Sequence, residues 1–258
     1  MNAKPTSKTF LLLADISGYT HFMRESPVAS SHARQVIIRL LKALIGASAP
    51  PLTVAELEGD AVFFYATTSG DDLDRIAFQI KEQMLSLFAS FYAETRKLAE
   101  MKACECDACS NVGGLKLKQI LHVGDVAIER VNQFTKLFGV DVILIHKLLK
   151  NSVPSNEYVL MTGQAHTVIT DFHGLTPRIL REKVEEFGTV KVVVFYPIHP
   201  SSMVRANESP KPTTTDTLTW SCRLKWNTIL VLMSRDLKPV RLNTHSMKKR
   251  GKQREGSS

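Results

Sequence analysis

Two aspartates occupy positions where a divalent metal ion is commonly held. Asp15 ends the apolar run of residues 10–14, and Asp60 follows Gly59 directly ahead of a second apolar run. Short apolar runs bounded by turn residues predict buried strands, so each carboxylate is expected at the end of a strand. Two convergent carboxylates suit a hard cation such as Mg²⁺, whose remaining ligands are commonly substrate phosphates. The alternative is that each acid only caps its own turn.

Three cysteines form a second candidate site. Cys104, Cys106 and Cys109 give the spacing C-x-C-x-x-C in a polar segment. Thiolates this close together can bind Zn²⁺ or an iron–sulfur cluster, with a fourth ligand from His122, Cys222 or a second copy of the chain. The spacing also suits redox chemistry, and the alternative to both is a set of reduced thiols that pack a loop.

Hydrophobic periodicity predicts the elements that must position these residues. Helices are expected where apolar residues recur at helical spacing, and strands where β-branched and aromatic residues form short runs. The predicted strands are residues 10–14, 52–58, 61–66, 115–123, 126–131, 158–161 and 189–196. The predicted helices are residues 30–46, 69–101 and 139–151. This order indicates an α/β (α+β) sandwich, ferredoxin-like, in which helices pack on a mostly antiparallel sheet.

A glycine in the middle of the chain predicts a tight turn. Gly124–Asp125 is expected to form the hairpin turn that joins strands 115–123 and 126–131. His122 lies just before it, at the end of a predicted strand. We expect its ring to be satisfied by main-chain groups rather than to act in chemistry.

Charge divides the chain into two parts. Residues 201–258 contain 12 Lys and Arg against 4 Asp and Glu, so this segment carries the whole net charge of +8. Residues 1–200 are therefore balanced, which argues against a phosphate-tracking surface on the folded part. We expect a domain over residues 1–199 and a basic, largely disordered tail over residues 200–258. The alternative for the tail is an arm that touches an anionic membrane or nucleic acid.

Hydropathy and cysteine content bear on the cellular compartment. No run approaches the roughly 20 apolar residues that a membrane helix needs, so no transmembrane segment is expected. The apolar run near the start is short and is interrupted by Asp15, unlike a signal peptide. Four cysteines, three of them clustered, suit a reducing compartment. The sequence therefore predicts a cytoplasmic protein.

The segments around the two aspartates also resemble a known family. ADISGYT and LEGDAVFFY look like the two metal-binding segments of class III nucleotidyl cyclases. The resemblance continues through Leu115–Val126 and Gly139–Leu149 in the family's order. Residues 1–199 as a whole, with the cysteine cluster, resemble a family of uncharacterised bacterial proteins related to those cyclases. The fold implied by the resemblance is the same mostly antiparallel sandwich that the element order indicates.

The resemblance implies a metal-dependent nucleotide site. Asp15, Ile16 and Asp60 fall on the family's metal positions, which would hold Mg²⁺ or Mn²⁺ together with a nucleoside triphosphate. One ion would activate the ribose hydroxyl and the other would neutralise the phosphates. Each site in the family is shared between two protomers, so the resemblance also implies a homodimer.

Other family positions carry unexpected residues. Glu56 and Lys136 fall where the family reads the purine. Glu56 matches the residue of guanine-selective members, but Lys136 matches neither the adenine nor the guanine pattern. An acid and a base at these positions would pair and fill the pocket. Ile143 and Lys147 fall where the family has its transition-state Asn and Arg. Ile143 cannot hydrogen-bond a ribose, and Lys147 lacks the planar fork of Arg.

These residues support three hypotheses. The leading one is a homodimeric cyclase-homology domain that binds a nucleoside triphosphate with Mg²⁺ or Mn²⁺ and acts as a catalytically degenerate sensor or regulator. The second is an active purine nucleotide cyclase, or a related phosphoryl-transfer enzyme, with Lys147 as the remaining catalytic residue. The third is a metal or redox interaction module built on Cys104, Cys106 and Cys109. A nucleotide-binding assay separates the first two from the third.

Overall fold

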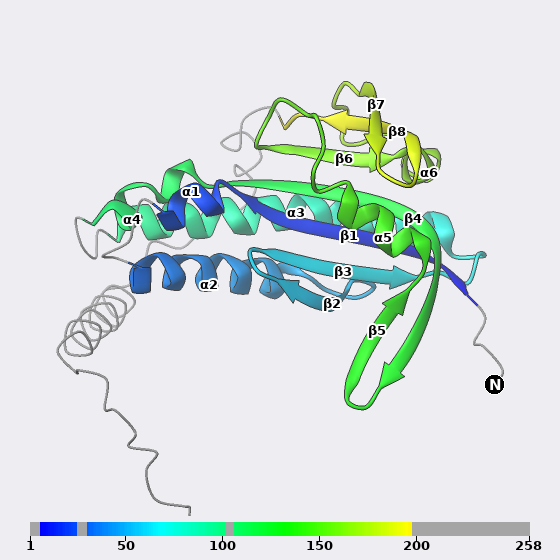
Figure 1. The fold of residues 1–258 in the computed structure, drawn as a ribbon, viewed down its shortest axis with the longest axis horizontal. Coiled ribbons are helices and arrows are strands. Elements are labelled where there is room, and N and C mark those ends of the chain that lie inside the picture. Colours follow the sequence, from blue (N-terminus) through cyan, green and yellow to red (C-terminus); the bar gives the residue numbers. More distant parts are fainter. Residues whose placement is uncertain (1–5, 25–29, 102–105, 198–258) are drawn as a thin grey trace, which may run out of the picture.

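One sheet organises the domain, which a computed structural model describes over residues 6–24, 30–101 and 106–197 (Figure 1). Its strands are β1 (Ser7–Ser17), β2 (Thr53–Glu58), β3 (Ala61–Thr67), β4 (Lys116–Val131), β5 (Phe134–Phe138), β6 (Tyr158–Thr162), β7 (Arg178–Val184) and β8 (Gly188–Phe195). They are arranged in the order β2-β3-β1-β4-β6-β8-β7, with β5 paired to β4 beyond this path. Strands β4 and β6 are parallel, and the other pairs are antiparallel.

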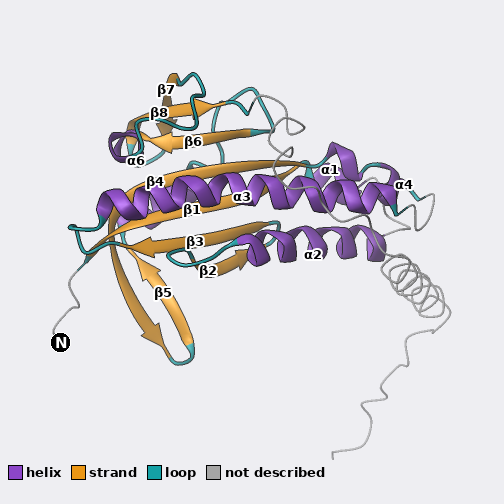
Figure 2. Ribbon diagram, turned by 180° about the vertical axis from the view of Figure 1, so that it is seen from behind, coloured by secondary structure: helices purple, strands orange, loops and turns teal. Residues whose placement is uncertain are grey.

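Helices cover both faces of the sheet. They are α1 (Tyr19–Arg24), α2 (Ser30–Ala47), α3 (Leu73–Glu100), α4 (Asp107–Ser110), α5 (Val140–Lys147) and α6 (Gly163–Val168), with a 3-10 turn, η1, at Val112–Gly114. The long helices α2 and α3 lie side by side on one face, and α5 lies on the other (Figures 1 and 2). The described chain thus has the expected architecture, a mostly antiparallel sheet with helices packed on it, and the predicted fold class is confirmed.

The alternation of side chains along β1 explains how the sequence specifies this layering. Successive residues of a strand point to opposite faces of the sheet. Phe10 and Leu12 pack in the core under α2 and α3, whereas Leu11 and Leu13 pack in the core under α5. All four are fully buried, so the segment is continuously apolar rather than alternating. The same alternation places Asp15 on the α5 face.

The predicted hairpin at Gly124–Asp125 is wrong. Strand β4 runs through this position, and Gly124 pairs with Thr9 of β1. The glycine is required for space, because a Cβ atom there would lie 2.2 Å from Cγ of Asp141. The hairpin turn comes instead at Asn132 and Gln133, between β4 and β5, and Asn132 has a left-handed φ of 55°. Strand β5 was not predicted because its side chains are largely exposed and give no burial pattern.

Several other elements are present with different bounds. Helix α3 begins at Leu73 rather than Ser69, because the Ser69 N–H donates to the Asp72 carboxylate in a turn that precedes the helix. Helix α5 ends at Lys147 rather than Asn151. The short elements α6 and β7 were not predicted. Across the described residues, no helix is both long enough and apolar enough to cross a membrane. The tail predicted for residues 200–258 lies outside the described residues.

Candidate functional site

Asp15 and Asp60 are brought together beside the end of β1. Asp15 pairs with Ala61, the first residue of β3, so Asp60 is its neighbour across the sheet. The main chain also joins the two segments, because the Ile16 N–H donates to the Asp60 carbonyl oxygen at 3.2 Å. Gly59 precedes Asp60 in the turn from β2 and has a φ of 65°, a conformation that favours glycine. The two carboxylates predicted from the sequence thus belong to one site.

The negative charge of Asp60 is poorly compensated. Burial and, to a smaller extent, the charge of Asp15 raise the pKa of its carboxyl group from 3.8 to about 6. A main-chain hydrogen bond and the charge of Lys118 oppose the rise but are smaller influences. Two neighbouring carboxylates with too little positive charge between them are the electrostatic setting that a divalent cation relieves.

A lysine that the sequence analysis did not single out shares this site. Lys118 of β4 pairs with Asp15 across the sheet, and its Nζ lies 3.0 Å from Asp15 Oδ2. The ammonium group also donates to the Leu149 carbonyl oxygen at 3.3 Å. The two charged side chains are only 18% and 15% exposed, so their ion pair is partly shielded from water. Lys118 therefore neutralises Asp15 and leaves Asp60 as the uncompensated acid.

The donor set nevertheless fits Mg²⁺ or Mn²⁺. Both ions prefer oxygen ligands, and both are commonly held by one or two carboxylates plus the phosphates of a substrate. Asp15 and Asp60 supply the carboxylates. The side chain of Ile16 is buried in the opposite layer of the core, so only its main-chain carbonyl can contribute to a metal site.

The two predicted purine-reading residues form an ion pair. Lys136 Nζ of β5 lies 2.7 Å from Glu56 Oε2 of β2, and the two side chains are 46% and 47% exposed. This contact joins strands that are far apart in the strand order. Each group is already the other's partner, so a nucleotide base that used these positions would have to compete with the ion pair.

Helix α5 presents the residues at the family's transition-state positions. Ile143 is 49% exposed and offers no hydrogen-bonding group. Lys147 Nζ lies 3.1 Å from Glu186 and 3.5 Å from Glu185, both in the turn between β7 and β8. The hydrogen bond with Glu186 raises the pKa of Lys147. The charge of Lys147 is therefore already paired with acidic residues of the same chain.

A second side chain of α5 ties the helix to the sheet, and the sequence analysis missed it. His146 Nε2 lies 2.7 Å from Glu58 Oε1 at the end of β2. The other ring nitrogen, Nδ1, lies 2.6 Å from the Val142 carbonyl oxygen. Because Glu58 precedes Gly59 and Asp60, this contact connects α5 to the turn that carries the second acid.

His122 has side-chain partners and not the main-chain partners that we expected. Its Nδ1 lies 2.8 Å from the Thr162 hydroxyl, and its Nε2 lies 2.9 Å from Asp141 Oδ1. Burial lowers the pKa of His122, so the neutral ring donates from Nε2 to Asp141 and accepts at Nδ1 a hydrogen bond from the Thr162 hydroxyl. The Asp, His and Thr order resembles a nucleophilic triad, but Thr162 is fully buried and also caps α6. The arrangement is therefore structural.

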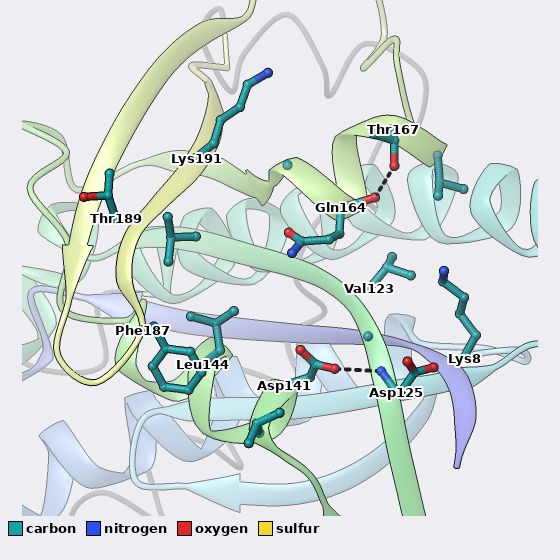
Figure 3. A pocket seen from close by; sticks show the side chains of 15 residues that line it. Lys8, Val123, Asp125, Asp141, Leu144, Gln164, Thr167, Phe187, Thr189 and Lys191 are labelled. Carbon is teal, nitrogen blue, oxygen red and sulfur yellow. Dashed lines mark hydrogen bonds between the residues drawn. The ribbon is translucent and has the colours of Figure 1, made fainter. Parts of the chain in front are cut away.

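A cleft of about 860 Å³ opens beside this network, between β4, α5, α6 and the β7–β8 turn (Figure 3). Lys8 and Lys191 lie on its walls, and Asp125 and Asp141 lie near its floor. The Asp141 carboxylate is already used by His122 and by the Asp125 N–H, which donates at 2.7 Å. None of the predicted metal or purine positions lines the cleft. It is a separate feature of the domain.

The cysteine motif is joined by a histidine that the sequence analysis did not consider. His32 Nδ1 lies 3.4 Å from Cys106 Sγ, and one ligand atom each of His32, Cys106 and Cys109 lies within 4.8 Å of the others. Cys104 and Cys222 lie outside the described residues. His122, also suggested as a fourth ligand, has both ring nitrogens engaged by Asp141 and Thr162.

Sequence comparisons relate part of the chain to other proteins. Residues 37–158 match the family described as "Protein of unknown function (DUF2652)". The uncharacterized protein Rv2561/Rv2562 of Mycobacterium tuberculosis is 37% identical over 124 residues, which are 48% of this chain and 56% of that protein. The chain thus matches only about half the length of this relative. The matched family region includes Asp60 but begins after Asp15.

Solved structures share the arrangement of the sheet and helices. The adenylyl cyclase CyaB from P. aeruginosa aligns with a TM-score of 0.51 over 75% of this chain and 96% of the cyclase, at 13% identity. The chain has the class III nucleotidyl cyclase fold. A bacterial light-regulated adenylyl cyclase gives a TM-score of 0.53 over 86% of this chain and 58% of that protein, at 14% identity. Identity this low establishes the fold of the cyclase-like domain and leaves its activity open.

Within the cyclase-like domain, the predicted residues fall into separate groups. Asp15 and Asp60 are neighbours, and Glu56 contacts Lys136. Lys147 is directed to the β7–β8 turn, whose acidic residues could not be recognised as its partners from the sequence. The sequence analysis missed Lys118 and His32 because their partners are distant in sequence. Within their own segments, they looked like ordinary residues of a strand and a helix.

Proposed function

We propose that this cyclase-like domain binds a nucleoside triphosphate together with Mg²⁺ or Mn²⁺ and does not turn it over as an ordinary cyclase does. The observation that carries the proposal is that Asp15 and Asp60 are neighbours, with the pKa of Asp60 raised to about 6 by burial and by the charge of Asp15. A divalent ion bridging the two acids would favour their charged forms and would present a positive charge to phosphates.

The state of α5 supports the loss of turnover. A cyclase needs donors that stabilise charge as the ribose hydroxyl attacks the α-phosphate, and Ile143 supplies none. Lys147 is held by Glu185 and Glu186, so its charge is already satisfied. Removing one preorganised donor typically costs about 10²–10³ in rate, so the loss of both would leave little ordinary turnover.

Exposed apolar residues support a homodimer. Phe134 and Phe138 of β5, in the hairpin arm that β5 forms with β4, are 59% and 51% exposed. Val140 and Ile143 of α5 are 67% and 49% exposed. Apolar side chains gathered on one arm and one helix mark an interaction surface more often than scattered ones do. A second copy that covered α5 would bring the acids of one protomer toward the Ile143 helix of the other, as the family resemblance implies. We infer a regulatory or sensing dimer.

Calorimetric titration of the full chain tests binding. ATP and GTP are each titrated in the presence of Mg²⁺ and, separately, Mn²⁺, and at least one combination is expected to give saturable heat. Asp60→Asn should abolish it. Asp71→Asn, a change of the same kind beyond the opposite end of β3, should leave it unchanged. A folded protein that gives no heat with either nucleotide contradicts the proposal.

Turnover is measured separately, as cyclic nucleotide formed from ATP or GTP. We expect none above the background of the Asp60→Asn variant. Formation of cyclic AMP or cyclic GMP that disappears in Asp15→Asn and Asp60→Asn would instead identify an active purine cyclase, and the proposal of a degenerate domain would be wrong.

A further inference from the structure

Three side chains of the kind that binds soft metal ions converge away from the acidic site. His32 lies in the first turn of α2, Cys106 lies just before α4, and Cys109 lies within α4. They come from segments that are 74 residues apart in sequence, yet their ligand atoms all lie within 4.8 Å of one another. Long-range packing, and not chain proximity, assembles this group.

The spacing of the three ligand atoms is close to that of a zinc site. With bonds of about 2.3 Å to sulfur and about 2.0 Å to nitrogen, tetrahedral coordination separates neighbouring ligand atoms by about 3.3–3.8 Å. The observed separation of 3.4 Å between His32 Nδ1 and Cys106 Sγ falls in that range. Ligand atoms that lie up to 4.8 Å apart would reach these separations by small side-chain rotations.

Burial and the helix end also suit a metal. His32 is 7% exposed, and the two cysteines are half-buried, so an ion there would be largely shielded from water. The N-terminus of an α-helix favours negative charge. Because Cys106 Sγ contacts His32 in the first turn of the 18-residue α2, the cysteine lies near such a terminus. A thiolate is the form of cysteine that binds metals.

We propose that His32, Cys106 and Cys109 bind one Zn²⁺ ion per chain. Imidazole and thiolate ligands favour Zn²⁺, whereas the carboxylate oxygens of Asp15 and Asp60 favour Mg²⁺ or Mn²⁺. Three protein ligands leave the fourth tetrahedral position for water or another donor. The zinc site is independent of the proposed nucleotide site and does not require it.

The position of the cluster gives the ion a structural role. Helix α4 leads directly into η1, whose Gly114 carbonyl oxygen lies close to Gly18, at 3.7 Å from the place a Cβ atom of Gly18 would take. Ser17 of β1 then pairs with Lys116 at the start of β4. Zinc at His32 would clamp the start of α2 to this segment, which borders the strand end that carries Asp15.

Metal analysis of the full chain tests the proposal. The protein, purified under reducing conditions without chelator, is expected to contain one zinc per chain by elemental mass spectrometry. Cys106→Ser and His32→Ala should each lower the content at least about tenfold. Two controls should retain it: Cys222→Ser, which changes the cysteine outside the C-x-C-x-x-C motif, and Asp60→Asn, which changes the proposed acidic metal site. Equal loss of zinc in Cys222→Ser would overturn the assignment.

Cobalt substitution keeps the test decisive if a variant fails to fold. Wild-type protein stripped of zinc and given Co²⁺ should show thiolate-to-cobalt charge-transfer absorption and the visible bands of a tetrahedral site. Removing the metal should lower the melting temperature by about 5–10 °C, and added Zn²⁺ should restore it. Zinc-free protein without a cobalt spectrum, or a disulfide between Cys106 and Cys109 under the same conditions, would contradict the proposal.

Discussion

The residue that most changes the view of the acidic site is Lys118. Its ammonium group lies 3.0 Å from Asp15 in a partly buried ion pair, where the sequence suggested only two carboxylates. A divalent ion that bound Asp15 would compete with Lys118 for the negative charge of this carboxylate. The proposed metal site would therefore have to weaken the Lys118–Asp15 ion pair when it is filled.

Asp60 makes the free site less stable as the pH rises. Its pKa is about 6 in the folded protein against 3.8 as the ordinary value, so between these pH values the folded state binds more protons than the unfolded state. The free energy of unfolding therefore falls as the pH rises through this window. Above pH 6 the penalty is complete, about 1–2 kcal/mol after allowing for solvent screening of a half-buried group.

Asp60→Asn should remove that penalty. We expect the variant to melt higher than the wild type at pH 7.5, with the difference shrinking as the pH falls toward 4. Thermal melts of both proteins across this range measure it. Adding Mn²⁺ at pH 7.5 should stabilise the wild type and leave the variant unchanged. A variant that is less stable at pH 7.5 would show that Asp60 is held by contacts beyond those described.

Lys118→Met should strengthen divalent binding. Without the ammonium group, Asp15 loses its internal counter-ion, and Mn²⁺ should bind about five- to tenfold more tightly, equivalent to about 1–1.4 kcal/mol. Lys116→Met is the matched control, because Lys116 belongs to the same strand but lies over the ring of Tyr92. Weaker Mn²⁺ binding in Lys118→Met would indicate that the lysine assists the metal.

At the scale of elements, α5 is the helix to which we assign the proposed loss of turnover. The helix keeps its place on the sheet through Leu144, Ile145 and Leu148, all buried, and through the His146–Glu58 contact. Its exposed face, with Ile143 and the ion-paired Lys147, lacks the donors that cyclase chemistry uses. Packing and chemistry thus lie on different faces of one short helix.

Restoring that face should restore activity. The double variant Ile143→Asn, Lys147→Arg should raise cyclic nucleotide formation by about 10² or more, because both lost donors return. Ile38→Asn, Lys42→Arg makes the same two changes at the same spacing at exposed positions of α2, on the other face of the sheet, and should have no effect. No rise in the first variant would mean that the acids and α5 do not form one site in the assembled protein.

Elements with strong burial patterns could be predicted, and those without could not. The run of residues 10–14 identified β1 because both of its faces are buried, and the acids at its end followed from that. Gly124 was misinterpreted, since a glycine that admits the Asp141 side chain looks the same in sequence as one that makes a turn. Neither the register of the strands nor the packing of distant segments could be predicted from the sequence. The pairing of Lys118 with Asp15 and the contact of His32 with Cys106 were therefore found only in the folded chain.

For the whole molecule, charge separates two regions. The described domain lies within the electrically balanced part of the sequence, and the net charge of +8 belongs to residues 201–258. That segment is rich in Pro, Thr and Ser between its basic residues, so it has little apolar surface to bury. We propose that it is dispensable for the fold of the cyclase-like domain.

A shortened chain that ends at Pro200 tests this proposal. It should express, melt cooperatively within about 2 °C of the full chain, and retain its metal content and oligomeric state. Differential scanning calorimetry measures the melting temperature, light scattering measures the oligomeric state, and elemental mass spectrometry measures the metal content. Trp220 and Trp226 are the residues that argue against it, because large aromatic side chains favour burial. Insolubility, or a melting temperature several degrees lower, would mean that these residues pack on the domain.

The central claim is that Asp15 and Asp60 hold a divalent ion that in turn holds a triphosphate, and its most direct test is the metal dependence of nucleotide affinity. The dissociation constants of ATP and GTP are measured by calorimetry with Mg²⁺ and again with excess EDTA. For the preferred nucleotide, we predict binding at least about tenfold tighter with the metal, and no such difference in the Asp15→Asn, Asp60→Asn double variant. Affinity that is equal with and without the metal, or no binding of either nucleotide by the folded protein, would contradict the account.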